Sequence, residues 1–176
     1  MSSDTKGRPG SVNGDLADYL EKRKEEVMSE WRKRVRSDAA ILPSKSLNPA
    51  ALTNHLPQIF ESLCGTLRRQ QSRAFSEQAL LDAREHGAIR WRQGYELSEV
   101  MRELKHLRSI LIYHQRAFED LHPDNGMAAN LFISTILHRF LDEMVIDVTE
   151  EYLAVLLSPK EKKKRKRQFD DEDSRD

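Results

Sequence analysis

Between residues 15 and 157, apolar side chains recur every three or four positions, and few Gly or Pro residues interrupt this spacing. Such a spacing places the apolar side chains on one face of an α-helix. Single-sided stripes of this kind can be buried only against one another, so they predict a bundle of helices. The whole chain holds 7 Gly and 6 Pro, which argues against a sheet-rich fold with many tight turns.

Five segments carry the stripe. Asn48 and Pro49 suit the start of the second segment, as an N-cap followed by proline at the first helical position. Gly94 suits the end of the third. We therefore expect an all-α, five-helix bundle with a four-helix-bundle-like core centred on the second, fourth and fifth helices. Globin-like packing fits the same pattern, because periodicity does not fix crossing angles. The expected helices are residues 15–36, about 49–71, 76–94, 97–121 and 127–157.

Both ends of the chain differ from the middle. Residues 1–14 hold only two apolar residues, so we expect them to be disordered. Residues 158–176 carry eight positive and six negative charges, and we expect a charged, disordered tail after a single helical domain at 15–157. A run of six cations in this tail could instead bind nucleic acid or an anionic membrane surface. The run consists of Lys162, Lys163, Lys164, Arg165, Lys166 and Arg167.

The overall composition excludes several classes of protein. Lys plus Arg number 29, as do Asp plus Glu, so the formal net charge is zero. Cys64 is the single cysteine, which excludes an intramolecular disulfide and a cysteine-clustered metal site. No apolar run approaches the ~18 residues of a membrane span. We therefore expect a cytoplasmic protein.

Motifs of catalysis and cofactor binding are also missing from the sequence. It contains no phosphate-binding glycine loop, no GxSxG and no HExxH. We therefore expect a chain that is not an enzyme and that holds no metal or cofactor. A haem-binding, globin-like sensor is an alternative, with His86 or His138 as the candidate iron ligand.

The most specific pattern spans the third and fourth expected helices and reads HGxxRxxxGYxLxExxxELxxLR over residues 86–108. In this pattern Gly87 allows a neighbouring helix to approach closely. Charged side chains in such a hairpin should be paired if they are buried, because a buried unpaired charge is costly. Ordinary surface ion pairs are the alternative interpretation. We expect a polar pivot between the two helices, formed by His86, Arg90, Gly94, Tyr95, Glu99, Glu103 and Arg108.

This motif, with the regions around Trp31 and Leu56–Pro57, resembles the N-terminal sensor domain of the stressosome protein RsbRD. The likeness covers about residues 16–152. Similar helical domains precede the kinase cores of many two-component sensor histidine kinases. The resemblance implies a non-catalytic bacterial signal-input module of the stress response, which relays a stimulus through helix packing. We expect no output domain after residue 157, and so a separate partner such as a kinase, phosphatase or antagonist.

The end of the fifth expected helix carries apolar side chains on several faces, more than one monomer's core requires. We therefore expect a homodimer whose seam is formed by this helix, alone or together with the first. The apolar residues in question are Val145, Ile146, Val148, Tyr152, Leu153, Val155, Leu156 and Leu157.

Overall fold

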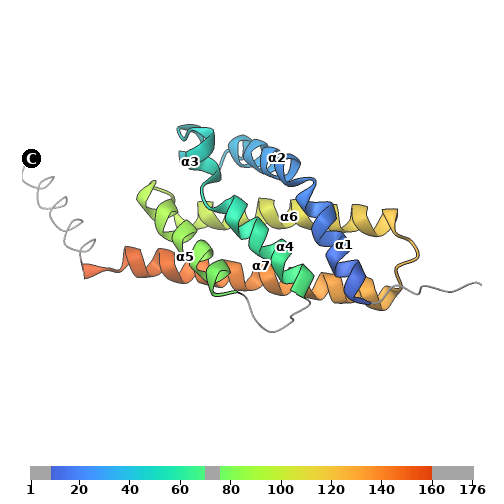
Figure 1. Ribbon diagram of the computed structural model, residues 1–176. Helices are drawn as coiled ribbons and strands as arrows, with labels where there is room; N and C mark the ends of the chain where they lie inside the picture. Colours follow the sequence, from blue (N-terminus) through green and yellow to red (C-terminus); the bar gives the residue numbers. More distant parts are fainter. Residues whose placement is uncertain (1–8, 70–75, 160–176) are drawn as a thin grey trace, which may run out of the picture.

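The computed structural model describes residues 9–69 and 76–159, and every regular element within these ranges is helical (Figure 1). The predicted all-α fold class is confirmed, but the predicted number of five helices is wrong. The described residues form seven α-helices and one short 3₁₀ helix. They are α1 (Pro9–Glu21), α2 (Lys24–Ser37), η1 (Pro43–Lys45), α3 (Pro49–Thr53), α4 (Leu56–Arg69), α5 (Glu77–Arg92), α6 (Leu97–Leu121) and α7 (Met127–Leu156).

The first predicted helix is divided into α1 and α2 by a turn at Lys22 and Arg23. The backbone N–H of Arg23 donates to the carbonyl of Leu20 at 2.9 Å. Leu20 and Val27, on either side of the turn, are both buried. The apolar spacing therefore continues through the turn, and neither Gly nor Pro marks the break.

The start of α1 also differs from the prediction. Residues 9–14, which we expected to be disordered, are helical, and both Val12 and Asn13 are buried. The helix packs against α4, which supplies an apolar surface that local composition cannot show. Residues 1–8 lie outside the described part of the chain.

The second predicted helix is divided into α3 and α4. Its start agrees with the prediction, since the Asn48 Oδ1 accepts a hydrogen bond from the N–H of Ala51 at 2.8 Å and Pro49 follows the cap. The helix then stops at Asn54, which has a φ of +47°. Its ψ is −128°, so this residue lies outside the α-helical region. A residue in this conformation cannot continue an α-helix, so α4 begins as a separate element.

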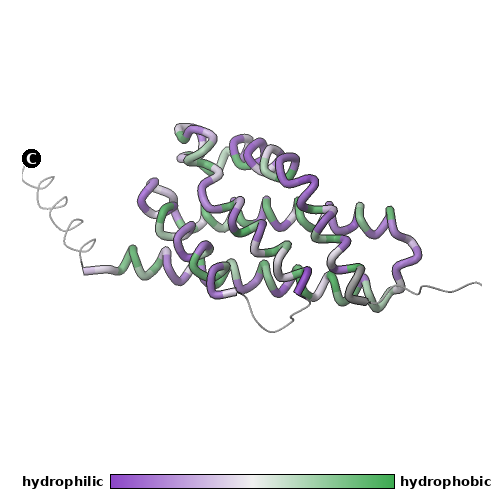
Figure 2. Tube along the Cα trace, in the orientation of Figure 1, coloured by the Kyte–Doolittle hydropathy of each residue, from purple (hydrophilic) through white to green (hydrophobic). Residues whose placement is uncertain are grey.

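The two longest helices, α6 and α7, form an antiparallel hairpin that extends along the whole molecule (Figure 1). Their ends agree with the predicted ends to within one residue. α5 packs against α7 and α2 against α6, while α1 and α4 cross the hairpin obliquely. Hydrophobic and hydrophilic residues alternate along the helices (Figure 2), and the buried apolar side chains meet in one core.

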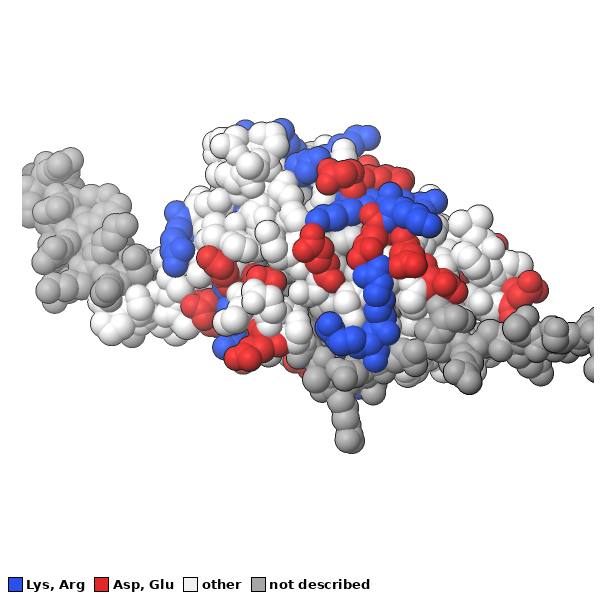
Figure 3. Space-filling view, viewed as in Figure 1, with Lys and Arg blue, Asp and Glu red and all other residues white. Residues whose placement is uncertain are grey.

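The surface over α1, α2 and α4 carries charges of both signs (Figure 3). Arg68 lies 2.6 Å from Glu21 and 2.7 Å from Asp18, and Lys24 lies 2.6 Å from Glu61. These ion pairs connect neighbouring helices, and the opposite charges within them neutralise each other. Among the described residues, no helix is both long enough and apolar enough to span a lipid bilayer.

Candidate functional site

A buried ion pair between α5 and α6 forms the centre of the predicted pivot. The Nε of Arg90 donates to the Oε2 of Glu103 at 2.6 Å, and both side chains are fully shielded from solvent. The charges are thus paired, as we predicted for a buried site. Removing two ions from water costs several kcal/mol each, so such a pair needs close geometry and further hydrogen bonds.

The remaining donors of Arg90 supply those hydrogen bonds. Its Nη1 donates to the Oε1 of Gln93 at 2.6 Å and to the carbonyl of Ala51 at 3.3 Å, and its Nη2 donates to the carbonyl of Leu52. Both carbonyls lie in the last turn of α3, where carbonyl groups lack partners within the helix. One guanidinium group therefore connects α3, α5 and α6.

Tyr95 lies beside this pair, in the turn between α5 and α6. The guanidinium carbon of Arg90 lies 4.8 Å from the centre of the Tyr95 ring. Burial raises the pKa of the Tyr95 hydroxyl, and the negative charge of Glu103 acts in the same direction. The backbone carbonyl of Tyr95 accepts a hydrogen bond from the hydroxyl of Tyr152 at 2.8 Å, which attaches the turn to α7.

His86 completes the cluster but makes no close polar contact. Its side chain is fully buried, and its Nε2 lies 3.7 Å from the Oε2 of Glu103. Neither ring nitrogen has a hydrogen-bond partner in the described part of the chain. Burial lowers the pKa of His86, and the positive charge of Arg90 acts in the same direction. The ring is therefore neutral at neutral pH.

The lowered pKa of His86 predicts that acidification destabilises the fold. The unfolded chain, with a histidine pKa near 6.5, takes up a proton before the folded chain does. The contribution of neutral His86 to the free energy of unfolding is therefore complete above about pH 6.5. It decreases as the pH falls toward the pKa of the folded chain, by at most about 1.4 kcal/mol per pH unit. Urea unfolding between pH 8 and 5 should show this slope, and His86→Gln should reduce it.

His114 offers a second test of the same reasoning. Burial also lowers its pKa, so His114→Gln should reduce the slope as well. If His86→Gln leaves the pH dependence of unfolding unchanged, the buried histidine does not remain neutral in the folded state.

Two glycines shape this junction, as the motif indicated. A Cβ atom at Gly87 would lie 2.3 Å from the carbonyl oxygen of Val148 in α7. The predicted close approach of another helix at Gly87 is therefore confirmed. Gly94 has a φ of +80°, and it ends the turn after α5 as predicted.

Two of the predicted pivot residues lie outside the cluster. The Glu99 carboxylate accepts from the N–H of Glu96 and from the N–H of Leu42, both at 2.8 Å, so it caps α6 and holds the loop before η1. Arg108 reaches α7 and lies 2.9 Å from Asp142. Of the predicted set, the structure brings together the side chains of His86, Arg90, Tyr95 and Glu103, and Gly94 lies in the adjoining turn between α5 and α6.

Sequence signals for the other partners of the cluster are weak. The indole Nε1 of Trp31 donates to the backbone carbonyl of Glu103 at 3.1 Å. Trp31 belongs to the apolar stripe of its helix, which predicts burial but not this bond. The α3 carbonyls that accept from Arg90 belong to the backbone, so no residue type in the sequence marks them.

The structure gives little support for other chemistry at the remaining candidate residues. Burial raises the pKa of the Cys64 thiol to about 12, so it is a poor nucleophile. Within the described ranges no three His, Cys, Asp or Glu residues are grouped to hold a metal ion. Of the haem-ligand candidates, His86 lies against Glu103, and the Nδ1 of His138 is hydrogen-bonded to Arg108. The cationic run at 162–167 lies outside the described residues.

Comparison with known proteins identifies a family. A family model described as the RsbT co-antagonist protein rsbRD N-terminal domain matches residues 25–159. The match extends from the first turn of α2 to just beyond α7, and it includes every residue of the predicted pivot. Neither the comparison with curated proteins nor that with solved structures gave a match.

Proposed function

The chain belongs to the RsbT co-antagonist protein rsbRD N-terminal domain family, and from this we propose that it is a non-catalytic, cytoplasmic signal-input module of bacteria. It receives a stimulus or a binding partner and relays the event by a change in helix packing. Its output partner is a separate protein of the stress response: a kinase, a phosphatase or an antagonist. The resemblance found in the sequence and the family match support this proposal.

The observation that carries the proposal is the set of bonds made by Arg90. A displacement of α3 would remove the Ala51 and Leu52 carbonyls from the guanidinium group. Arg90 would then need new acceptors or would shift relative to Glu103, because a buried N–H without a partner is costly. Movement of α3 is therefore coupled to α6.

The turn between α5 and α6 extends this coupling to α7. Tyr95 lies between the Arg90 guanidinium and the hydroxyl of Tyr152. A shift of the turn would stretch the bond to Tyr152, which is buried near the end of α7. In this proposal α3 is the receiving element and α7 the responding element.

The family description names RsbT, so an RsbT protein is the first partner to test by calorimetric titration of the purified chain. We expect binding, and we expect Arg90→Lys to change the dissociation constant by about tenfold, the equivalent of about 1.4 kcal/mol. Lysine keeps the charge but cannot reproduce the planar fork of donors that holds α3.

Arg68→Lys is the matched control, because Arg68 lies in an exposed ion pair away from the pivot. Circular dichroism should show that both variants remain helical. Absence of binding by the natural chain would contradict RsbT as partner. Equal affinity of all three chains would contradict the role of the pivot.

The module acts as a homodimer in this proposal, with α7 in the seam. Ile146, Leu153 and Leu157 are exposed, as a seam requires. Val148 and Tyr152, which we had expected in the seam, are instead buried in the core of the monomer.

A further inference from the structure

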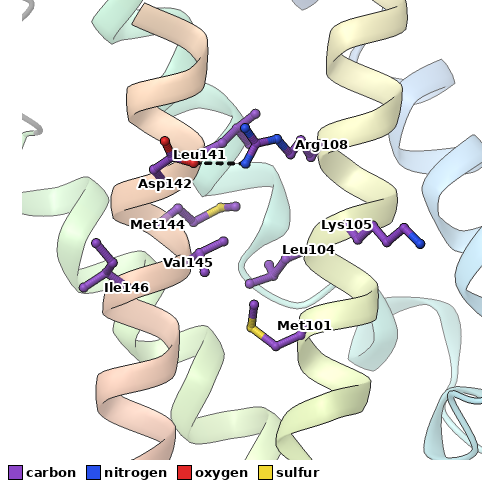
Figure 4. A pocket seen from close by; sticks show the side chains of 9 residues that line it. All are labelled: Met101, Leu104, Lys105, Arg108, Leu141, Asp142, Met144, Val145 and Ile146. Carbon is purple, nitrogen blue, oxygen red and sulfur yellow. Dashed lines mark hydrogen bonds and ion pairs between the residues drawn. The ribbon is translucent and has the colours of Figure 1, made fainter.

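Two grooves flank α6, and they differ in chemistry. The groove between α6 and α7 has a volume of about 320 Å³ and is lined mainly by apolar side chains (Figure 4). Two of its charged residues, Arg108 and Asp142, already bond to each other at 2.9 Å (Figure 4). The groove between α2 and α6 is larger, with a volume of about 440 Å³. Polar side chains line this α2–α6 groove: Glu26, Ser29, Glu30 and Arg34 from α2, and Tyr113 and His114 from α6.

The protein itself uses few of the polar groups in the α2–α6 groove. The carboxylate of Glu26 and the hydroxyls of Ser29 and Tyr113 form no ion pair or hydrogen bond with any residue that the structure describes. Arg34 donates from its Nε to the Oε1 of Glu30 at 2.8 Å, and its two Nη groups have no partner in the described ranges. A small molecule can therefore bind to these groups without breaking a contact within the fold.

His114 distinguishes this groove from an ordinary polar surface. The residue is only 4% exposed, yet its Nδ1 has no hydrogen-bond partner among the described residues. Burial lowers the pKa of His114, so at neutral pH the ring offers one donor and one acceptor. Buried polar groups are nearly always hydrogen-bonded. An imidazole with an unused nitrogen beside a groove therefore indicates that a ligand completes its hydrogen bonding.

The free charges of the groove are spaced for a zwitterion. Arg34 bonds to Glu30, so its guanidinium group lies at the level of Glu30 along α2. Glu26 lies one turn before Glu30, about 6 Å away along the helix axis. In an α-amino acid the ammonium and carboxylate groups are joined through one carbon atom. With a hydrogen bond of about 2.8 Å at each end, such a molecule spans the separation between Glu26 and the guanidinium group.

The α6 side of the groove suits an apolar side chain. Tyr113 is 64% exposed, so its ring is available for packing. Ile110 lies one turn before Tyr113 on α6 and lines the same groove. An amino acid whose charged groups bind to α2 would thus place an aromatic or aliphatic side chain against α6.

We propose that the α2–α6 groove binds a free α-amino acid with an aromatic or aliphatic side chain. The ligand's ammonium group pairs with Glu26, and its carboxylate pairs with the Nη groups of Arg34. Its side chain packs against Ile110 and Tyr113, and His114 supplies a further hydrogen bond. This inference rests on the proposed signal-input function and names the chemical class of the stimulus.

Two bonds connect the α2 side of the groove to the pivot. The indole Nε1 of Trp31 donates to the carbonyl of Glu103 at 3.1 Å, and both residues are buried. The Nη1 of Arg32 donates to the hydroxyl of Thr53, at the end of α3, at 3.4 Å. A ligand that draws α2 toward α6 therefore displaces both α3 and the backbone of Glu103, whose side chain bonds to Arg90.

The first test is a calorimetric titration of the full chain with L-phenylalanine and with L-leucine. We expect saturable binding of both amino acids. Two related compounds test whether both charged groups are recognised: 2-phenylethylamine lacks the carboxylate, and 3-phenylpropionate lacks the ammonium group. Each should bind at least about tenfold more weakly than L-phenylalanine, because each loses one charge-assisted hydrogen bond.

The second test locates the site. Glu26→Gln and Arg34→Gln should each weaken the binding of L-phenylalanine by at least about tenfold. Glu26→Gln should not weaken the binding of 3-phenylpropionate, and Arg34→Gln should not weaken that of 2-phenylethylamine, because each compound lacks the group that the replaced residue binds. Glu25→Gln is the matched control: Glu25 is an exposed carboxylate beside Glu26 but outside the groove, and its replacement should leave the affinity unchanged.

Three results would overturn the proposal. Binding of neither amino acid would exclude the ligand class, while the RsbT titration would still test the signal relay. Binding of L-phenylalanine that both Glu26→Gln and Arg34→Gln leave unchanged would exclude the groove as the site. Equal affinities for L-phenylalanine and 2-phenylethylamine would exclude recognition of the carboxylate by Arg34.

Discussion

Replacement of Arg90 by methionine is expected to lower the free energy of unfolding by about 3–5 kcal/mol. The change leaves the Glu103 carboxylate, which is fully buried, without its cation. It also removes the donor to the Leu52 carbonyl and one of the two donors to the Ala51 carbonyl in α3, where the Nε2 of Gln93 remains. Urea unfolding followed by circular dichroism at neutral pH measures the loss.

Two further variants show whether the loss comes from the unpaired charge. Arg90→Met combined with Glu103→Leu should recover more than half of it, because no buried charge remains, although the Leu52 carbonyl in α3 still lacks its donor. Arg68→Met removes an exposed cation from Asp18 and Glu21 and should cost less than about 1 kcal/mol. If Arg90→Met lowers the free energy of unfolding no more than Arg68→Met does, the buried ion pair contributes no more to stability than an exposed one.

Replacement of Gly87 by alanine is expected to destabilise the protein by about 3 kcal/mol. Alanine normally stabilises the interior of a helix by about 1 kcal/mol relative to glycine, so the expected effect has the opposite sign. The reason is the added Cβ, which would lie 2.3 Å from the carbonyl oxygen of Val148. A backbone atom cannot rotate away as a side chain can, so α5 and α7 must separate. Thermal and urea unfolding both measure the change.

Gly65 provides the matched control for this substitution. It lies inside α4, and a Cβ there would meet the end of the Arg69 side chain at 3.3 Å. That side chain can move, so Gly65→Ala should be neutral or stabilising by up to about 1 kcal/mol. If Gly87→Ala is as well tolerated as Gly65→Ala, the contact between α5 and α7 adjusts easily.

The sequence predicts well those elements whose signals are local. The ends of α6 and α7 coincide with the ends of the apolar stripes, and the cap at Asn48 follows from the residue types alone. The turn at Lys22 and Arg23 has no such signal, since buried residues continue on both sides of it. Asn54 could have indicated a break, but Asn also occurs within helices.

The candidate site shows the same division. Arg90 and Glu103 belong to one motif, and the cost of a buried charge predicts that charged residues of the motif pair if they are buried, without saying which residues pair. The bonds from Arg90 to α3 reach carbonyls 38 and 39 residues away in the chain, and any residue type could supply a carbonyl there. Glu99 was misplaced because a carboxylate in the first turn of a helix can cap that helix instead of joining a neighbouring cluster.

The contact between Gly87 and Val148 limits how α5 can move. Along α7 the carbonyl of Val148 faces the one position of α5 without a side chain in that stretch, with His86 and Ala88 on either side. A longitudinal slide by one residue would drive that carbonyl into a Cβ atom. We therefore expect α5 and α7 to move together, and Gly94, which has a φ of +80°, lies in the turn that joins this pair to α6.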